Sequence, residues 1–99
     1  MTLLTITNNM KKIVGKVAED EKNSIRTLYN HKNSLEELIL VLKDDDEVYK
    51  KVLSDLNDTK QKYQEWWDTM SQKYQWEKTK NGRWQINFDT CEIYLIDND

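Results

Sequence analysis

The sequence contains no proline, two glycines, one cysteine and one histidine among its 99 residues. Because proline is the residue that most strongly interrupts a helix, its absence favours long helices. The single cysteine, Cys91, cannot form an internal disulfide, and the single histidine, His31, cannot supply a histidine-rich metal site. We therefore expect a helix-rich protein of the reducing cytoplasm, with no disulfide framework, no metal and no other cofactor.

Long hydrophobic runs are also missing, and no stretch approaches the roughly 20 apolar residues of a membrane-spanning helix. The opening of the chain lacks the basic start and apolar core of a secretory signal, so we expect neither secretion nor membrane insertion. The 18 acidic and 15 basic residues are interleaved. Because phosphate binding needs concentrated Lys and Arg, this pattern disfavours a nucleic-acid partner and fits a peptide or protein partner better.

Aromatic side chains are concentrated in one segment, Tyr63–Trp76, which holds three of the four Trp. Its rings recur at helical spacing together with Met70, and shorter apolar segments flank it on both sides. We expect the other elements to dock on this segment. A chain of this length forms one core, so residues 1–99 are predicted to be a single domain.

Residues 1–17 predict an N-terminal arm or strand. Their apolar side chains stand among Thr, Asn and Lys, which fits either a strand or an apolar entry into the next helix. These side chains are Leu3, Leu4, Ile6, Ile13, Val14 and Val17. Met10 is an alternative start, and the residues before it would then be an upstream extension.

Residues 18–74 predict an antiparallel helical hairpin. The acidic run Glu19–Glu21 marks a first helical turn, where it interacts favourably with the helix dipole. The run Lys43–Asp46 predicts the turn, with one of its Asp residues capping a second helix from about Glu47 to Tyr74. The apolar positions, at helical spacing, are Ile25, Leu28, Leu35, Ile39 and Leu42, then Tyr49, Val52, Leu56, Tyr63, Trp66 or Trp67, and Met70.

One polar position interrupts the apolar seam of each predicted helix, namely Lys32 in the first and Thr59 in the second. If the hairpin turns near Asp45, positions whose numbers sum to about 91 face each other. Lys32 then lies opposite Thr59, with Asp58 beside it. We predict that these three residues form one structural polar layer, which fixes the helix register ahead of any role in binding a ligand.

Residues 76–96 predict a small antiparallel β-meander, because the apolar period changes to two after Trp76. Its first strand would be Trp76–Lys80, followed by an Asn81-Gly82 turn with positive φ at both residues. A second turn is allowed at Asp89-Thr90. The predicted inward-facing side chains are Trp84, Ile86 and Phe88 in the second strand and Cys91, Ile93 and Leu95 in the third. The sequence thus predicts an α+β fold, a long antiparallel helical hairpin followed by a small C-terminal antiparallel β-meander.

No catalytic constellation appears in the sequence. Cys91 and His31 fall on different predicted elements, and Cys91 lies on the inward strand face, so a buried structural thiol is favoured over a nucleophile. The acidic run Asp44–Glu47 lacks the alternating spacing and the glycine of a calcium loop, so it indicates a solvated turn. We assign no catalytic residue and no metal ligand, and we do not expect an enzyme.

The candidate partner-binding residues are Trp66, Trp67, Trp84, Glu92 and Tyr94. Adjacent helical residues point about 100° apart, so Trp66 and Trp67 cannot both enter one helix seam. Either one ring packs on the hairpin and the other on the meander, or one ring is exposed and binds a partner. The last strand also accepts an extended peptide at its outer edge, unless the N-terminal segment covers that edge, and Trp84, Glu92 and Tyr94 would contact the peptide.

Self-association is a further expectation, because two helices with a wide apolar face cannot cover each other fully. Pairing two hairpins buries the remaining surface, which predicts a homodimer. The alternative is that the β-meander covers this face.

Four stretches of the chain form a recognisable combination. They are K-K-I-V-G-K-V from Lys11, K-N-S-L-E-E-L from Lys32 to Leu38, Q-E-W-W-D-T-M-S-Q-K-Y-Q-W from Gln64 to Trp76, and W-Q-I-N-F-D-T-C-E-I-Y-L from Trp84 to Leu95. Together they resemble the small bacterial family called CXXX repeat peptide modification system proteins. The resemblance covers residues 10–95 and leaves the first nine outside. It implies an accessory protein that accompanies radical-dependent enzymes modifying Cys-containing precursor peptides, and it carries over no catalytic residue.

Two functions remain open at this point. The first is a non-catalytic accessory or adaptor protein in bacterial peptide modification, which binds a precursor peptide or the modifying enzyme. The alternative is a small acidic inhibitor or immunity-type protein that blocks a basic surface of a target protein.

Overall fold

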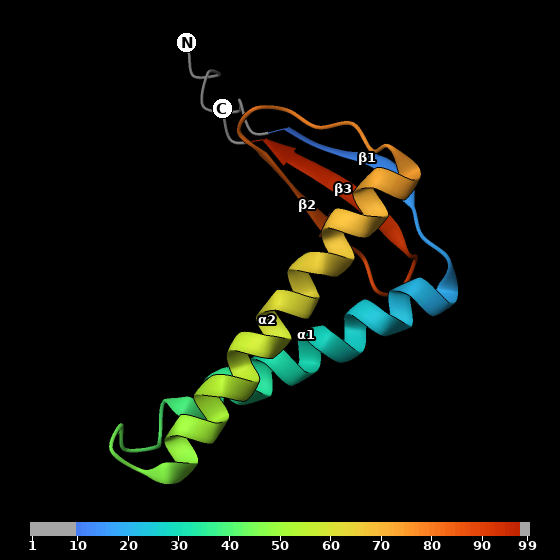
Figure 1. Cartoon of the computed structure of the whole chain (residues 1–99). Coiled ribbons are helices and arrows are strands. Elements are labelled where there is room, and N and C mark those ends of the chain that lie inside the picture. The colour runs from blue at the N-terminus through green and yellow to red at the C-terminus, as the bar shows by residue number, and fades with distance from the viewer. Residues whose placement is uncertain (1–9, 98–99) are drawn as a thin grey trace. The chain divides into compact units, whose positions relative to one another are not determined.

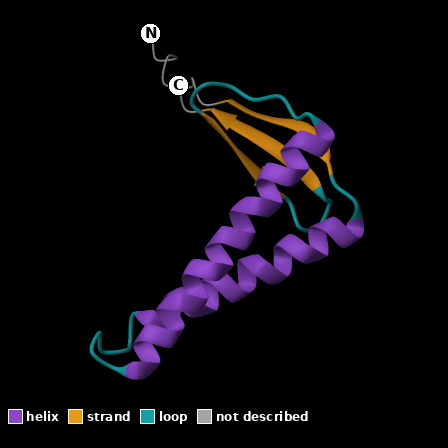
Figure 2. Ribbon diagram, in the orientation of Figure 1, coloured by secondary structure: helices purple, strands orange, loops and turns teal. Residues whose placement is uncertain are grey.

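The computed structural model describes residues 10–97, which belong to two compact units. One unit contains residues 10–22 and 70–97, and the other contains residues 23–69. The elements are β1 (Met10–Lys16), α1 (Glu19–Ile39), α2 (Glu47–Tyr74), β2 (Gly82–Ile86) and β3 (Glu92–Asp97), as Figures 1 and 2 show. The α+β fold class is confirmed, because the chain forms a helical hairpin and a three-stranded antiparallel sheet. The expectation of a single domain over residues 1–99 stays a prediction.

Local hydrogen bonds define both helix starts. Glu21 Oε1 accepts the N–H of Ala18, the residue before α1, at 2.9 Å, which is half of a capping box. Asp46 Oδ1 accepts the N–H of Val48 at 2.9 Å and so caps α2, as the sequence predicted. At its other end α2 stops where Gln75 adopts a φ of 54°, the left-handed conformation typical of a helix C-terminus.

The sheet has the order β1-β3-β2, and β3 lies in its centre (Figure 1). The N-terminal segment is therefore a strand, and the first strand predicted for the meander, Trp76–Lys80, is wrong. Asn81 and Gly82 also lack the positive φ that the predicted tight turn requires. Instead the N–H of Gly82 donates to the carbonyl of Thr79 at 3.4 Å, so Lys80-Asn81 is the centre of the turn, one residue earlier than predicted, and the turn leads into β2. The apolar residues predicted before Met10 lie outside the described residues.

The alternation predicted for β3 is confirmed. Ile93 and Leu95 are 0 % and 1 % exposed, and Cys91 just before the strand is also buried. A five-residue hydrogen-bonded turn precedes β3, in which the N–H of Cys91 donates to the carbonyl of Asn87 at 2.8 Å. Cys91 has a φ of 65°, so this turn closes with a left-handed residue. Phe88 lies in the turn and not in β2, which ends at Ile86.

A bulge in β1 sets which side of the strand faces the core. Ile13 pairs with Tyr94 and Gly15 with Ile93, so Val14 is the extra residue on β1. Gly15 therefore takes the register position opposite a fully buried side chain. A Cβ atom at Gly15 would lie 2.5 Å from Nε1 of Trp76, so only glycine lets the indole ring approach the strand this closely.

Trp76 is the centre of an aromatic cluster in the unit that contains the sheet. Its ring is stacked on Tyr74, with centroids 5.9 Å apart, and meets Trp84 edge to face at 5.6 Å. Trp84 Nε1 donates to the carbonyl of Glu77 at 3.0 Å, and the Glu77 carboxylate pairs with Lys12 at 2.7 Å. These contacts hold the segment after α2 against β1 and β2, which explains why that segment does not form a strand of its own.

The start of α1 and the end of α2 are joined through Glu21. Its carboxylate accepts hydrogen bonds from the Lys73 ammonium and the Tyr74 hydroxyl. Partial desolvation would raise the pKa of Glu21, but the hydrogen bonds from Lys73, Tyr74 and Ala18 outweigh it and lower the pKa to about 2. The bond to Glu21 also raises the pKa of Lys73 and of Tyr74. The ionised carboxylate is therefore part of the folded structure.

The other unit has its own apolar core. Leu35, Val52 and Leu56 form a buried cluster against which Ile39 and Leu42 pack. The two helices therefore meet along the predicted seam, with the chain reversing near Asp45.

Replacing Gly15 with Ala should destabilise the fold. The added methyl group must displace the Trp76 ring, so we expect a loss of about 2 kcal/mol in the free energy of unfolding, measured by urea denaturation. Lys16→Ala, an exposed change at the next residue of β1, is the matched control and should change stability by less than about 0.5 kcal/mol. Equal stabilities of the two variants would contradict the close packing of Trp76 on Gly15.

Lowering the pH should remove the contribution of Glu21 to the stability of the fold. Folding lowers its pKa from 4.5 to about 2, so the stabilisation is complete above pH 4.5 and is lost as the pH falls toward 2. After allowance for solvent screening, we expect Glu21→Gln to lower the free energy of unfolding by about 1 kcal/mol at pH 7 and by almost nothing at pH 2. Glu37→Gln, an exposed change on the same helix, is the control. A Glu21→Gln deficit that does not change with pH would refute the linkage.

Candidate functional site

The predicted alternative of an exposed Trp in the Trp66-Trp67 pair is wrong. The two residues are 8 % and 7 % exposed, and their rings meet edge to face with centroids 4.9 Å apart. Trp67 also contacts the ring of Tyr63 at 6.4 Å, and Tyr63 in turn contacts Tyr29 at 6.5 Å. These rings therefore contribute to the interior, and neither indole offers a surface for a partner.

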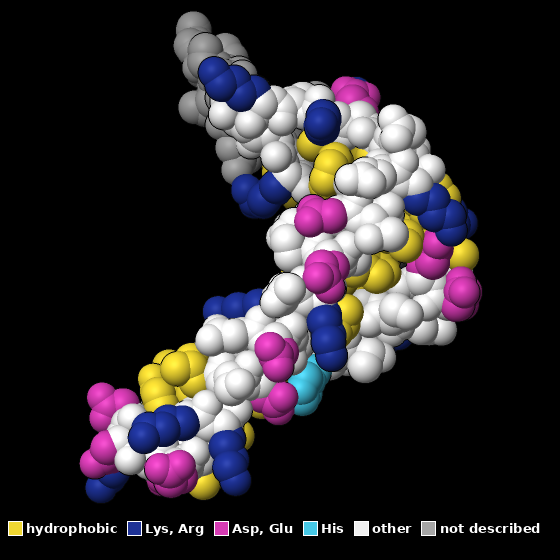
Figure 3. All heavy atoms as spheres, viewed as in Figure 1, with side chains coloured by type: hydrophobic (Ala, Val, Ile, Leu, Met, Phe, Trp, Pro, Cys, Tyr) yellow, Lys and Arg dark blue, Asp and Glu magenta, His cyan; other side chains and the backbone are white. Residues whose placement is uncertain are grey.

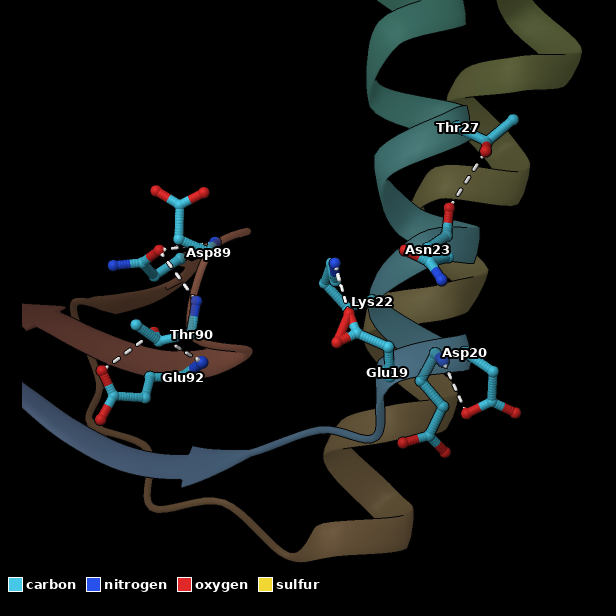
Figure 4. Close-up of polar contacts among 10 residues, drawn as sticks. Glu19, Asp20, Lys22, Asn23, Thr27, Asp89, Thr90 and Glu92 are labelled. Carbon is cyan, nitrogen blue, oxygen red and sulfur yellow. Dashed lines mark hydrogen bonds and ion pairs between the residues drawn. The ribbon is translucent and has the colours of Figure 1, made fainter.

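The outer edge of β3 is not free to accept a peptide, because β1 pairs along one edge of this strand and β2 along the other. Of the two predicted alternatives, the structure has the one in which the N-terminal segment covers the edge, although the covering strand begins at Met10. Trp84 is half-buried and lies opposite Leu95 in the ladder. Glu92 and Tyr94 lie on the other face of β3. There Glu92 Oε1 accepts the hydroxyl of Thr90 at 3.0 Å (Figure 4) and the hydroxyl of Tyr94 at 3.3 Å. The structure therefore leaves Trp84, Glu92 and Tyr94 without the peptide edge that was expected to bring them to a partner.

The polar layer has a different anion from the predicted one. Asp58 is exposed, and the carboxylate that pairs with the Lys32 ammonium is Glu36, at 3.3 Å. The ammonium also lies over the rings of Tyr29 and Tyr63, 5.8 and 5.5 Å from their centroids. These contacts satisfy Lys32 mostly from its own helix, because Glu36 is four residues further along α1.

Thr59 is buried, and its hydroxyl donates to the carbonyl of Asp55 at 2.8 Å. The polar group is therefore satisfied within α2 and needs no partner from α1. Glu36 is the member of the layer that the sequence reasoning missed, and it also approaches Lys60 on α2 at 4.0 Å. The four-residue step from Lys32 to Glu36 is the signal that would have found it.

Exposed aliphatic side chains gather where the two helices are joined. Leu40 and Val41, in the turn, are 82 % and 77 % exposed, and three more lie on the adjoining helical turns. We call this set the tip patch; it comprises Leu38, Leu40, Val41, Val48 and Leu53. Figure 3 shows hydrophobic side chains on the molecular surface at this end of the hairpin. It is the densest group of exposed large aliphatic residues in the part of the chain that the structure describes.

The backbone beneath the tip patch is ordered by short-range hydrogen bonds. The N–H of Val41 donates to the carbonyl of Leu38 at 3.1 Å, and the N–H of Asp46 donates to that of Lys43 at 3.1 Å. The Asp46 cap then fixes Val48 at the start of α2. The exposed side chains are therefore presented from a defined turn, which lowers the entropy lost when a partner binds.

Acidic side chains surround the tip patch. Between residues 36 and 53 the sequence has six acidic residues and three lysines, an excess of three negative charges that equals the net charge of the whole chain. The acidic residues are Glu36, Glu37, Asp44, Asp45, Asp46 and Glu47. Within this set Glu47 is paired with Lys50 at 3.7 Å, whereas Asp44 and Asp45 are exposed. The surface therefore combines apolar side chains with a negative potential.

The sequence contained a signal for the tip patch. Leu38–Leu42 is a run of five consecutive apolar residues, whereas one face of a helix buries only about half of such a run. Ile39 and Leu42 take the inward positions, which leaves Leu38, Leu40 and Val41 outside.

Comparisons with protein-family profiles, curated proteins and solved structures find no match for this chain. Of the helices described, neither is both long and apolar enough to cross a membrane. Within residues 10–97, His, Cys, Asp and Glu side chains form no group of three placed to hold a metal ion.

Replacing Lys32 with Leu should preserve the fold. The change removes the ion pair with Glu36 and two ring contacts, and it adds apolar contact in a site that is already mostly buried. These terms oppose each other, so we expect the free energy of unfolding to change by less than about 1 kcal/mol. Thr59→Val should likewise be tolerated. A loss above about 2 kcal/mol for Lys32→Leu in urea denaturation would show that the charge itself holds the helices together.

Proposed function

We propose that this protein is a non-catalytic accessory protein that binds a peptide or protein partner through the tip patch. In line with the resemblance to the CXXX repeat peptide modification system proteins, the proposed setting is bacterial peptide modification. The partner is then a Cys-containing precursor peptide or the enzyme that modifies it.

The observation that carries the proposal is the exposure of Leu40 and Val41. Side chains that are 82 % and 77 % exposed contribute little to the hydrophobic stability of the chain itself. They also raise the risk of non-specific association. Large aliphatic groups clustered on an ordered turn are typical of a surface that becomes buried when a partner binds, since burial then supplies the driving force.

The acidic surroundings of the patch favour a second function, the blocking of a basic surface on a target protein. Asp44 and Asp45 are exposed beside Leu40 and Val41 in the sequence, as expected for a small acidic inhibitor. Both functions use the same surface, and they differ in whether the bound enzyme stays active. Adding the protein to the captured enzyme distinguishes them, because an accessory protein preserves or promotes its activity and an inhibitor abolishes it.

The function predicts that Leu40→Ser/Val41→Ser abolishes partner capture without unfolding the protein. We expect at least about a tenfold loss of partner recovered from native-host extract, since apolar residues at the centre of an interface carry most of its binding energy. Circular dichroism and urea denaturation should give the wild-type midpoint, because both side chains are exposed.

The matched control is Ile13→Thr, which also removes an exposed aliphatic group but lies on β1, in the other unit. It should capture the partner as the wild type does. The proposal fails if the tip variant and the wild type recover the same proteins in the same amounts.

A further inference from the structure

The tip patch identifies the chemistry of its partner. We infer that it binds a short amphipathic helix that presents Lys or Arg beside apolar side chains. This inference rests on the proposed function and specifies the partner of the same surface. The argument comes from the charge around the patch, its small extent and the order of the turn.

The negative charge near the tip patch favours a basic partner. The segment around the patch contains six acids and three lysines; Glu36 is paired with Lys32 and Glu47 with Lys50, which leaves four acids, Glu37 and Asp44–Asp46, against two lysines. A partner that brings positive charge gains attraction from Asp44 and Asp45, whereas an acidic partner meets repulsion. The apolar side chains supply the affinity, and the acids determine which apolar segment is accepted.

The same argument disfavours the other occupants. In a symmetric pair of copies the patch would meet itself, so each acidic surround would face another of the same sign. Residues 1–9 contain Leu and Ile but neither Lys nor Arg, so they lack the charge that this surface selects. An anionic membrane surface would be repelled by the acids for the same reason.

The extent of the patch sets the size of the bound segment. Leu40 and Val41, its two most exposed members, are adjacent in the turn, and Val48 and Leu53 point about 140° apart around α2, so the patch offers a short apolar surface that suits roughly two turns of a partner helix. Such a helix presents apolar residues at i, i+3, i+4 and i+7 on one side, flanked by its basic residues. A contact of this size is characteristic of transient complexes, and we expect micromolar affinity.

The probe for the test is a synthetic Leu/Lys amphipathic helix of about 14 residues. Two peptides accompany it: a Leu/Glu version of the same pattern, and a shuffled Leu/Lys version whose apolar residues no longer share a face. Isothermal titration measures affinity at low and high salt. We expect micromolar binding of the Leu/Lys helix and at least about tenfold weaker binding of the other two.

Protein variants test whether the Leu/Lys helix binds at the tip patch. Asp44→Asn/Asp45→Asn should lower the affinity for the Leu/Lys helix about three- to fivefold at low salt. The difference in affinity from the wild type should vanish near 1 M salt. Leu40→Ser/Val41→Ser should lower the affinity for the same peptide about tenfold or more at either salt concentration. Asp46 is left unchanged, because it caps α2.

The charge control is Asp58→Asn/Glu65→Gln, which removes two exposed charges from α2 about 18 Å or more along the helix from Asp46. At about 0.1 M salt it should bind within about twofold of the wild type, since the distance from Asp44–Asp46 exceeds the Debye length of about 10 Å. The inference is overturned if this control weakens binding as much as Asp44→Asn/Asp45→Asn. It is also overturned if the Leu/Glu helix binds as well as the Leu/Lys helix, or if Leu40→Ser/Val41→Ser binds normally.

The same variants separate this inference from the proposed function. If the partner from the host is lost with Leu40→Ser/Val41→Ser but kept in full with Asp44→Asn/Asp45→Asn at low salt, the tip patch is the binding surface and the basic-helix chemistry is wrong. If the host partner is kept with both variants, the proposed function fails, whatever the synthetic peptides do.

Discussion

The pairing of β1 with β3 is the constraint on which the sheet-containing unit depends. Met10 lies opposite Asp97 and Lys16 opposite Glu92, so the ladder joins segments separated by most of the chain. Closing so long a loop costs conformational entropy, which is recovered only when both edges of β3 are hydrogen-bonded and one face is covered. The bulge at Val14 then sets Gly15 against Trp76, and the indole covers the strand. The strand, the bulge and the indole contact therefore depend on one another.

Glu21 joins distant segments of the helices, as the β1–β3 pairing does for the sheet. As the third residue of α1 it accepts the N–H of Ala18, which is a local contact that any helix start can make. The same carboxylate also accepts hydrogen bonds from Lys73 and Tyr74 in the last turn of α2. One ionised group therefore caps the start of α1 and joins it to the end of α2. Desolvating a carboxylate is unfavourable unless hydrogen-bond donors compensate it, and here the donors from Lys73, Tyr74 and Ala18 do so and lower its pKa.

The features predicted correctly from the sequence are local ones. Helix starts at Glu19 and Glu47, the Asp46 cap and the end of α2 follow from capping and periodicity within a few residues, and the structure has them at these positions. Pairing of the N-terminal segment with β3 stayed one of two alternatives, because the two segments lie some 80 residues apart, and the local resemblance of Asn81-Gly82 to a hairpin turn wrongly predicted an additional strand before it. Lys32 was expected to lie beside Asp58 across the hairpin, but its carboxylate partner is Glu36 on its own helix, because an i, i+4 pair forms without ordering two separate helices.

The tip patch differs from these features because the fold does not require it. Ile39 and Leu42 complete the core beside Leu35, so polar residues at positions 40 and 41 would leave that core unchanged. Burying two aliphatic side chains against a partner supplies a few kcal/mol at about 25 cal/mol per Å², before the loss of translational and rotational freedom is subtracted. A turn held by its own hydrogen bonds and by the Asp46 cap reduces the additional loss from ordering the backbone. A small apolar surface can bind usefully under these conditions, provided that charge restricts its choice of partner, and the acids beside Leu40 and Val41 supply that restriction.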